Sequence, residues 1–127
     1  MPAAPRPAFE AYFARDMHNE SIDLPSTRED AMELFVFARF HARPGNEATI
    51  AEALGEVLAP TRREPGCLAA NAFRALGGPQ LFFIHSRWRD EAAFERHAGL
   101  PHTVRFLERV EPLIDHAHDI VRTAHIV

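Results

Sequence analysis

The stretch ELFVFARFHAR, residues 33–43, decides the fold class of this chain. It is rich in Phe and Val and runs into a Pro-Gly pair, which predicts a β-strand that ends at a turn. Both alternating faces are apolar in its first half, because Leu34 and Val36 lie on one face and Phe35 and Phe37 on the other. A small sheet that is covered by helices on one face usually shows polar side chains on the other. We therefore expect a second copy of the sheet to cover the remaining face.

A helix is predicted after this strand, from about Asn46 to Arg63. Apolar residues recur along it at helical spacing: Ile50, Ala53, Leu54, Val57 and Leu58. Pro60 is expected to kink the helix or to end it early, because an interior proline removes a hydrogen bond and clashes with the preceding turn. Pro65-Gly66 then stops the helix.

A β-hairpin is predicted next. Its strands, Cys67–Leu76 and Gln80–Arg89, are joined by a Gly-Gly-Pro connection, which is typical of a hairpin turn. The second strand has two partly apolar faces, one with His85 and the other with Ser86 and Trp88. Only one of these faces meets the helices. We expect it to be the face of Ser86 and Trp88, which leaves His85 on the face that a second sheet covers.

Two helical segments follow the hairpin. Asp90 is a suitable N-cap for a helix over Glu91–Ala98, because its side chain can accept a hydrogen bond from the first turn. Gly99 ends this helix. Pro101 suits the first turn of another helical segment, which runs toward Pro112.

The order of elements predicts the architecture. β-Branched residues indicate that the last piece, His118–Val127, is a final strand. The order is then strand, helix, strand, strand, helical region, strand. Two split β-α-β units of this kind make a ferredoxin-like βαββαβ sandwich, an α+β fold in which a four-stranded antiparallel sheet has its helices on one face. The apolar sheet face that remains predicts a homodimer.

Composition limits the protein class and its partners. With 127 residues, 46% of them apolar and 25% charged, the chain suits one folded domain. Its single cysteine, Cys67, can form no internal disulfide, which favours a reducing, cytoplasmic location. Its basic residues form no stripe, so nucleic acid is not an expected partner. No apolar run approaches the ~20 residues of a membrane span, and the N-terminus lacks the apolar stretch of a signal peptide.

Residues 1–32 are predicted to be an extension of a domain that covers residues 33–127. They are Pro-rich at the start and then acidic: residues 1–33 carry three Arg against seven Asp or Glu, whereas the other eleven Arg and eleven acids balance. A short amphipathic helix is one interpretation of the extension, because four of its apolar residues fall at helical spacing: Phe9, Tyr12, Phe13 and Met17. A frayed terminus is the other.

Four pieces of the sequence, each weak alone, form a fairly specific signal when they occur in order and at compatible spacing: Arg43-Pro44-Gly45, residues 59–68 (APTRREPGCL), residues 88–94 (WRDEAAF), and His97 followed by Pro101-His102. Together they resemble the antibiotic biosynthesis monooxygenase (ABM) domain family, which includes cofactor-free quinol and anthrone oxygenases. The resemblance covers about Leu34 to Val127. It implies a dimeric α/β barrel formed by two sheets, a pocket between sheet and helices for a hydrophobic aromatic substrate, and no metal, haem or flavin.

Two histidines are the candidate catalytic residues. A cofactor-free oxygenase must remove a phenolic proton from its substrate, and histidine suits this task because its pKa lies near neutrality. His97 shares a helix stripe with Phe94 and is expected to point inward as the proton acceptor. His102 is expected to assist as a hydrogen-bonding partner. The alternative for His97 is a half-buried histidine that only packs.

The candidate substrate-binding residues lie on the two hairpin strands. Trp88 and Ser86 are expected in the pocket, where the indole ring could stack on a planar substrate. A core tryptophan is the alternative. Asn71 and Phe73 share one strand face and are secondary candidates. Two positions depart from the family pattern: Ser86 stands where many members have a glutamate, and Ala70 where many have a tyrosine.

No metal or nucleotide site is expected. The chain has eight histidines, but no HExxH motif, no pair of helical i, i+4 histidines and no second cysteine. The predicted function is a cofactor-independent monooxygenase that oxidises a quinol or a polyketide-like phenol. One alternative is a protein that binds a hydrophobic metabolite without transforming it. Another is a cofactor-free isomerase of a small phosphorylated carbonyl compound, for which Arg74 or Arg87 would have to face the pocket.

Overall fold

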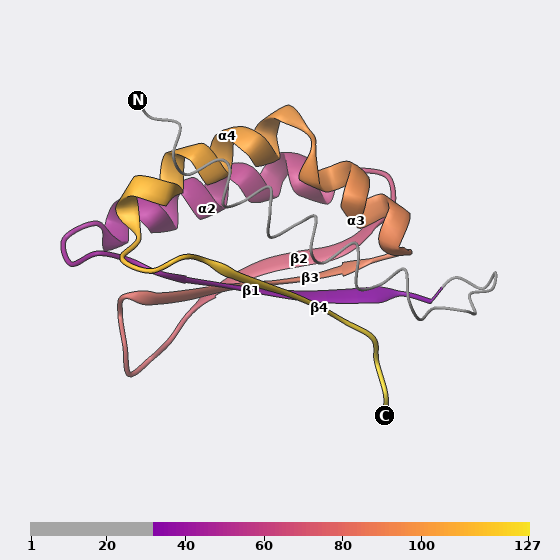
Figure 1. Cartoon of the computed structure of the whole chain (residues 1–127), viewed down its shortest axis with the longest axis horizontal. Helices are drawn as coiled ribbons and strands as arrows, with labels where there is room; N and C mark the ends of the chain where they lie inside the picture. The colour runs from indigo at the N-terminus through magenta and orange to yellow at the C-terminus, as the bar shows by residue number, and fades with distance from the viewer. Residues whose placement is uncertain (1–31) are drawn as a thin grey trace. The chain divides into compact units, whose positions relative to one another are not determined.

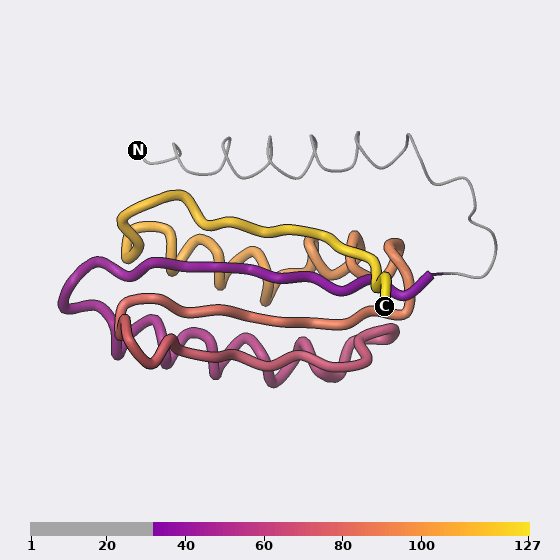
Figure 2. Tube along the Cα trace, turned by 90° about the horizontal axis from the view of Figure 1, so that it is seen from below, coloured from indigo at the N-terminus to yellow at the C-terminus, as the bar shows by residue number. Residues whose placement is uncertain are grey.

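A four-stranded antiparallel sheet, with the helices on one of its faces, makes up residues 32–127, the part of the chain that the computed structural model describes (Figure 1). The strand order is β2-β3-β1-β4, and Figure 2 shows the strands side by side. The strands are β1 (Leu34–His41), β2 (Cys67–Arg74), β3 (Leu81–Trp88) and β4 (Asp119–Thr123). This topology confirms the predicted ferredoxin-like sandwich.

The predicted N-terminal extension is not part of this description. Residues 1–31 lie outside the described residues, so both the extension over residues 1–32 and the short helix within it stay predictions. Within residues 32–127, no helix has the length and hydrophobicity needed to cross a bilayer.

The helical layer has four segments: α2 (Glu47–Arg62), α3 (Glu91–Ala98), α4 (Pro101–Val110) and the short 3₁₀ helix η1 (Glu111–Leu113). The predicted N-cap of α3 is confirmed, because the Asp90 carboxylate accepts a hydrogen bond from the backbone N–H of Ala93 at 2.9 Å. Only Gly99 and Leu100 separate α3 from α4. This short junction brings side chains from the end of α3 and the start of α4 close together.

The face of the sheet below the helices carries the core. One phase of β1 is at most 7% exposed, and its Phe40 packs against Phe106 of α4: Leu34, Val36, Ala38 and Phe40. The apolar stripe predicted on α2 is buried as well, from Ile50 to Leu58. Trp88 and Phe40 are among the largest fully buried side chains. Burial of this apolar area is the main source of the domain's stability.

Two elements differ from the sequence prediction. The helix α2 covers nearly all of the predicted range Asn46–Arg63, so the expected early end at Pro60 is wrong, and the kink at Pro60 stays a prediction. An N–H at position 60 would have bonded the carbonyl of Glu56, a residue on the exposed side of α2, and we expect water to solvate that carbonyl, so that the loss of the bond costs little. The last strand is shorter than the predicted His118–Val127. It pairs antiparallel with β1, and its last pair, Phe35 with Thr123, lies one residue from the start of β1, so β1 offers almost no further residues for pairing.

The opposite face of the sheet is apolar and exposed in the single chain. Phe37, Phe73 and Val121 are each about half exposed on it, at 48–53%. His85 lies on this outer face as predicted, with its ring centroid 4.8 Å from that of Phe37. Ser86 and Trp88 lie on the other side, toward the helices, which confirms the predicted orientation of β3. An exposed apolar surface of this kind is typical of a face that meets another protein chain.

Candidate active site

A buried carboxylate joins the two predicted catalytic histidines. The side chain of Glu64 is only 7% exposed, and its Oε2 lies 2.8 Å from His97 Nδ1 and 2.6 Å from His102 Nε2. The three residues come from three parts of the chain: the turn after α2, the last turn of α3 and the first turn of α4. We refer to Glu64, His97 and His102 as the carboxylate–histidine cluster. Sequence reasoning found both histidines but missed Glu64.

The turn that carries Glu64 depends on Gly66. This glycine has φ +91°, a backbone conformation that side chains other than glycine rarely adopt. A Cβ atom at Gly66 would lie 2.6 Å from the Cβ of Ala93 on α3. The carbonyl of Gly66 also accepts the backbone N–H of Arg89 at 2.8 Å. The turn therefore packs closely against the start of α3, and this packing directs Glu64 inward.

We expect Gly66→Ala to destabilise the protein by about 1–3 kcal/mol, since a left-handed backbone and a steric clash coincide at this position. Gly78→Ala is the matched control, because Gly78 has an ordinary φ and an added Cβ there would meet nothing within 4 Å. Urea unfolding of the two variants measures the difference. Equal stability of the two variants would show that the close approach at Gly66 is unimportant.

Burial controls the protonation of His97. Desolvation lowers the pKa of His97 below its ordinary value of 6.5, and the nearby His102 lowers it further. The hydrogen bond and the negative charge of Glu64 act in the opposite direction and raise it. The net result is a neutral imidazole at neutral pH. Because Glu64 holds Nδ1 as the donor, the lone pair of His97 is on Nε2, which is the arrangement of a general base.

We expect the stability of the protein to decrease as the pH falls below about 6.5. In that range the unfolded chain protonates the imidazole of His97, whereas the folded protein keeps it neutral until its lower pKa is reached. The loss should then level off. Urea unfolding from about pH 7.5 to about pH 5 measures it, with His97→Gln for comparison. The variant should show a shallower pH dependence, although not a flat one, because burial also lowers the pKa of His118. A variant as steep as the native protein would contradict this origin.

Trp88, hydrogen-bonded to Ser86, packs against His97 on the side of the sheet. The indole ring centroid lies 4.8 Å from that of His97 and 5.7 Å from that of Phe94. The indole Nε1–H donates a hydrogen bond to the hydroxyl of Ser86 at 2.9 Å, so both buried polar groups are satisfied. Trp88 itself is fully buried. It supports the base from below, and its predicted stacking on a substrate stays a prediction.

The other predicted residues do not join the cluster. Asn71 pairs with His85 across the sheet and Phe73 pairs with Phe83, so both lie on the outer face, opposite to Ser86. The prediction that they share one strand face is confirmed, but this face is on the side of the sheet away from His97. The amide oxygen of Asn71 accepts a weak hydrogen bond from Arg62 at 3.3 Å.

A hollow of about 440 Å³ opens beside His102, between α2 and α4. Its lining is mixed, with apolar side chains on one part and charged ones on the other: Ala53, Glu56, Val57, Pro60, His102, Arg105, Phe106, Glu108 and Arg109. A second hollow of about 370 Å³ lies between α2 and the β2 edge, and Phe73 and Arg74 contribute to it. Neither of these two hollows is lined by His97 or Trp88. Of the cluster residues, His102 lines the first of these hollows, which is large enough for a small molecule.

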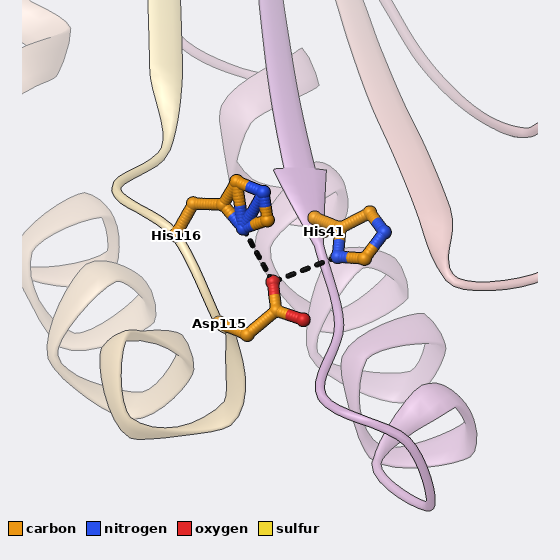
Figure 3. A group of neighbouring side chains, drawn as sticks. All are labelled: His41, Asp115 and His116. Carbon is orange, nitrogen blue, oxygen red and sulfur yellow. Dashed lines mark hydrogen bonds and ion pairs between the residues drawn. The ribbon is translucent and has the colours of Figure 1, made fainter.

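Two groups of side chains in residues 32–127 have the composition of a metal site. They are the carboxylate–histidine cluster and, elsewhere, His41 with Asp115 and His116 (Figure 3). Within each group the ligand atoms lie within 4.8 Å of one another. Sequence reasoning expected neither group, because distant segments supply the residues.

Comparison with known proteins agrees with this architecture. Residues 34–109 match the sequence model of the antibiotic biosynthesis monooxygenase family. A protein of Mycobacterium tuberculosis named "Putative monooxygenase Rv0793" is 30% identical over 79 residues, which cover 62% of this chain and 77% of the relative. The structure of Rv0793 superposes with a TM-score of 0.71 at 25% identity, covering 75% of this chain and 96% of that one. The crystal structure of PA3566 from Pseudomonas aeruginosa gives 0.72 at 29% identity, covering 79% and 100%.

Proposed function

Because the chain belongs to the antibiotic biosynthesis monooxygenase family, we propose that it oxidises an electron-rich aromatic compound, such as a quinol or a polyketide-like phenol, with molecular oxygen. The proposal includes independence from a metal, haem or flavin cofactor and a cytoplasmic location. The observation that carries it is the buried carboxylate between two histidines, with 2.8 Å and 2.6 Å contacts. This arrangement suits proton removal, the step that such chemistry requires from the protein.

The reaction needs the substrate as an anion. Removal of the hydroxyl proton makes the aromatic ring a better electron donor to oxygen. For a quinol, one atom of O₂ enters the ring, the other leaves as water, and the product is a hydroxylated quinone. Four electrons leave the quinol and reduce O₂, so no external reductant is required.

The proposed route for the proton starts at the hollow between α2 and α4. His102 lines this hollow and would hydrogen-bond the substrate hydroxyl. In this proposal His102, rather than His97, takes up the proton on Nδ1, because its Nε2 faces Glu64 and it is the histidine that lines the hollow. His97 donates its Nδ1–H to Glu64 and so helps to hold the carboxylate in place. The negative charge of Glu64 then stabilises the imidazolium that forms. In this proposal Glu64 is a positioning residue, and Trp88 supports His97 from below.

The experiment is oxygen uptake with reduced naphthoquinones and anthrones as substrates. The native protein should exceed the buffer rate, and His97→Ala and His102→Ala should each lose about 10²- to 10⁴-fold of that excess. His85→Ala on the outer face is the control and should retain it. Uptake equal to the buffer blank, or an unchanged rate in His97→Ala, would rule out the mechanism. Ligand-dependent thermal stabilisation without turnover would instead identify a non-catalytic binding protein.

The isomerase alternative has less support. A phosphorylated substrate needs converging cationic side chains. Arg87 lies on the outer face and forms an ion pair with Glu33 at 2.8 Å. Arg74 lies over the ring of Phe82, with its guanidinium carbon 5.0 Å from the ring centroid. These two residues therefore do not face one pocket.

We also propose that the chain forms a homodimer through the outer face of the sheet, as the family resemblance implies. Phe37 lies on the central strand β1 and is 50% exposed in the single chain. Phe37→Glu should therefore weaken the dimer at least about 30-fold, the effect of losing about 2 kcal/mol at a central interface residue. Sedimentation of the two proteins over a concentration series measures this. A native protein that sediments as a monomer would refute the dimer.

A further inference from the structure

Two histidines and one aspartate meet at the end of β1. His41 is the last residue of β1, and Asp115 and His116 lie in the segment between η1 and β4 (Figure 3). One oxygen of Asp115, Oδ1, lies 2.7 Å from His41 Nδ1 and 2.5 Å from His116 Nδ1. The centroids of the two imidazole rings are 4.8 Å apart. Both rings are thus turned toward the same carboxylate.

The backbone holds these residues in place. The N–H of Asp115 donates to the carbonyl of His41 at 3.0 Å, and the N–H of Arg43 donates to the carbonyl of Leu113 at 2.8 Å. Between these bonds, Ala42 forms a β-bridge with Ile114. The two segments that supply the three side chains are therefore tied together on both sides. A ligand that binds the side chains would not have to order the chain first.

We propose that His41, Asp115 and His116 bind a first-row divalent transition metal ion, with Zn²⁺ as the best match. Two imidazole nitrogens and one carboxylate oxygen are a ligand set that suits this ion. Ligands of a tetrahedral zinc ion lie about 2.0–2.2 Å from it, and so about 3.4 Å from one another. Small rotations of the three side chains would reach this spacing, since their ligand atoms already lie within 4.8 Å.

The exposure of the group also fits a metal site. The side chains are partly open, at 37% for His41, 27% for Asp115 and 64% for His116. An ion can therefore enter from solvent, and water can occupy its fourth position. Metal binding uses the ionised carboxylate and the neutral form of the imidazole. The positive charge of Arg43 acts on Asp115 and opposes the binding of a cation, so we expect moderate affinity for Zn²⁺.

This site is separate from the proposed active site. His41 is the last residue of β1, whereas Trp88 pairs with Leu34, the first residue of that strand. An eight-residue strand spans roughly 23 Å between these ends. The metal-site proposal can therefore be tested independently of the monooxygenase proposal. Its residues are also far apart in sequence, because 74 positions separate His41 from Asp115.

The test is titration of the full-length, tag-free protein with Zn²⁺ by calorimetry, supported by visible absorption of the Co²⁺ form. We expect one ion per chain bound through this group. His41→Ala and His116→Ala should each weaken binding at least about tenfold, and Asp115→Asn should do the same. His85→Ala is the matched control, since it removes another outer histidine without touching the group. Circular dichroism verifies that each variant is folded.

A second variant separates the two histidine groups. Glu64→Gln breaks the carboxylate–histidine cluster and should leave Zn²⁺ affinity at the His41 group unchanged. Loss of Zn²⁺ binding in Glu64→Gln but not in His41→Ala would show that the ion binds at the carboxylate–histidine cluster, and would overturn the proposal. Native protein that binds no Zn²⁺, or His41→Ala and Asp115→Asn variants that bind as well as the native protein, would also overturn it.

Discussion

Glu64→Gln should reduce oxygen uptake with reduced naphthoquinones by about 10²- to 10⁴-fold, close to the effect of removing a histidine of the same cluster. The amide keeps the size of the side chain but removes the negative charge that faces His97 and His102. It can also donate a hydrogen bond, and so it no longer fixes which nitrogen of His97 carries the proton. The protein should fold, because no volume is lost.

Two further measurements distinguish a positioning role from a structural one. The charge of Glu64 raises the pKa of His97, so the pKa of His97 in Glu64→Gln should fall below that in the native protein. Ring-proton NMR measures this directly. Glu64→Asp keeps the charge and should recover part of the activity. Glu52→Gln, at an exposed position on α2, is the control and should behave as the native protein. Full activity in Glu64→Gln would show that the buried carboxylate has no part in the reaction.

Trp88→Ala should destabilise the domain by about 3–5 kcal/mol, because it removes the largest fully buried side chain and leaves a cavity under α3. A domain of this size has a total stability of about 5–15 kcal/mol, so the variant should be marginally folded at 37 °C. The urea midpoint measures the loss. Leu76→Ala is the control: Leu76 is fully exposed, and the change should stay within about 0.5 kcal/mol.

Ser86→Ala tests the hydrogen bond separately from the packing. The indole N–H of Trp88 would lose its acceptor while remaining buried, at a cost of about 1–3 kcal/mol. Trp88→Phe removes the donor together with part of the ring, so it should cost less than Trp88→Ala. If Trp88→Ala were as stable as Leu76→Ala, the tryptophan would not be the support of this site.

The fold could be predicted because its signals are local. Alternation along β1, the Asp90 cap and the Gly-Gly-Pro hairpin each act over a few residues, and each appears in the structure. The early end of α2 expected at Pro60 was wrong. The free-energy cost of an interior proline depends on whether the carbonyl that loses its hydrogen bond is buried or open to water. The sequence does not show that exposure. The length of β4 was also missed, because the partner strand decides where pairing stops.

The candidate site could be predicted only in part. His97 and His102 stood out because they are close in sequence and lie on helices with an apolar stripe. The sequence around Glu64 gave no such signal. Glu64 lies in a turn, where the periodicity of apolar residues does not predict which way a side chain points. Its place before Pro65-Gly66, in a segment with family resemblance, was the only indication. His41 and His116 share no local pattern at all, since only the bridge between Ala42 and Ile114 brings them together.

The junction between α3 and α4 limits how this protein can vary in length. Gly99 and Leu100 alone connect the two helices, and one carboxylate must reach a ring on each side of them. An inserted residue in α4 before His102 would swing its imidazole about 100° around the helix axis, away from Glu64. At the tip of the hairpin between β2 and β3, a Cβ atom added at Gly77 or Gly78 would meet nothing within 4 Å, so residues can be inserted there. Loop-length engineering of this scaffold should therefore use the hairpin and leave the helix junction intact.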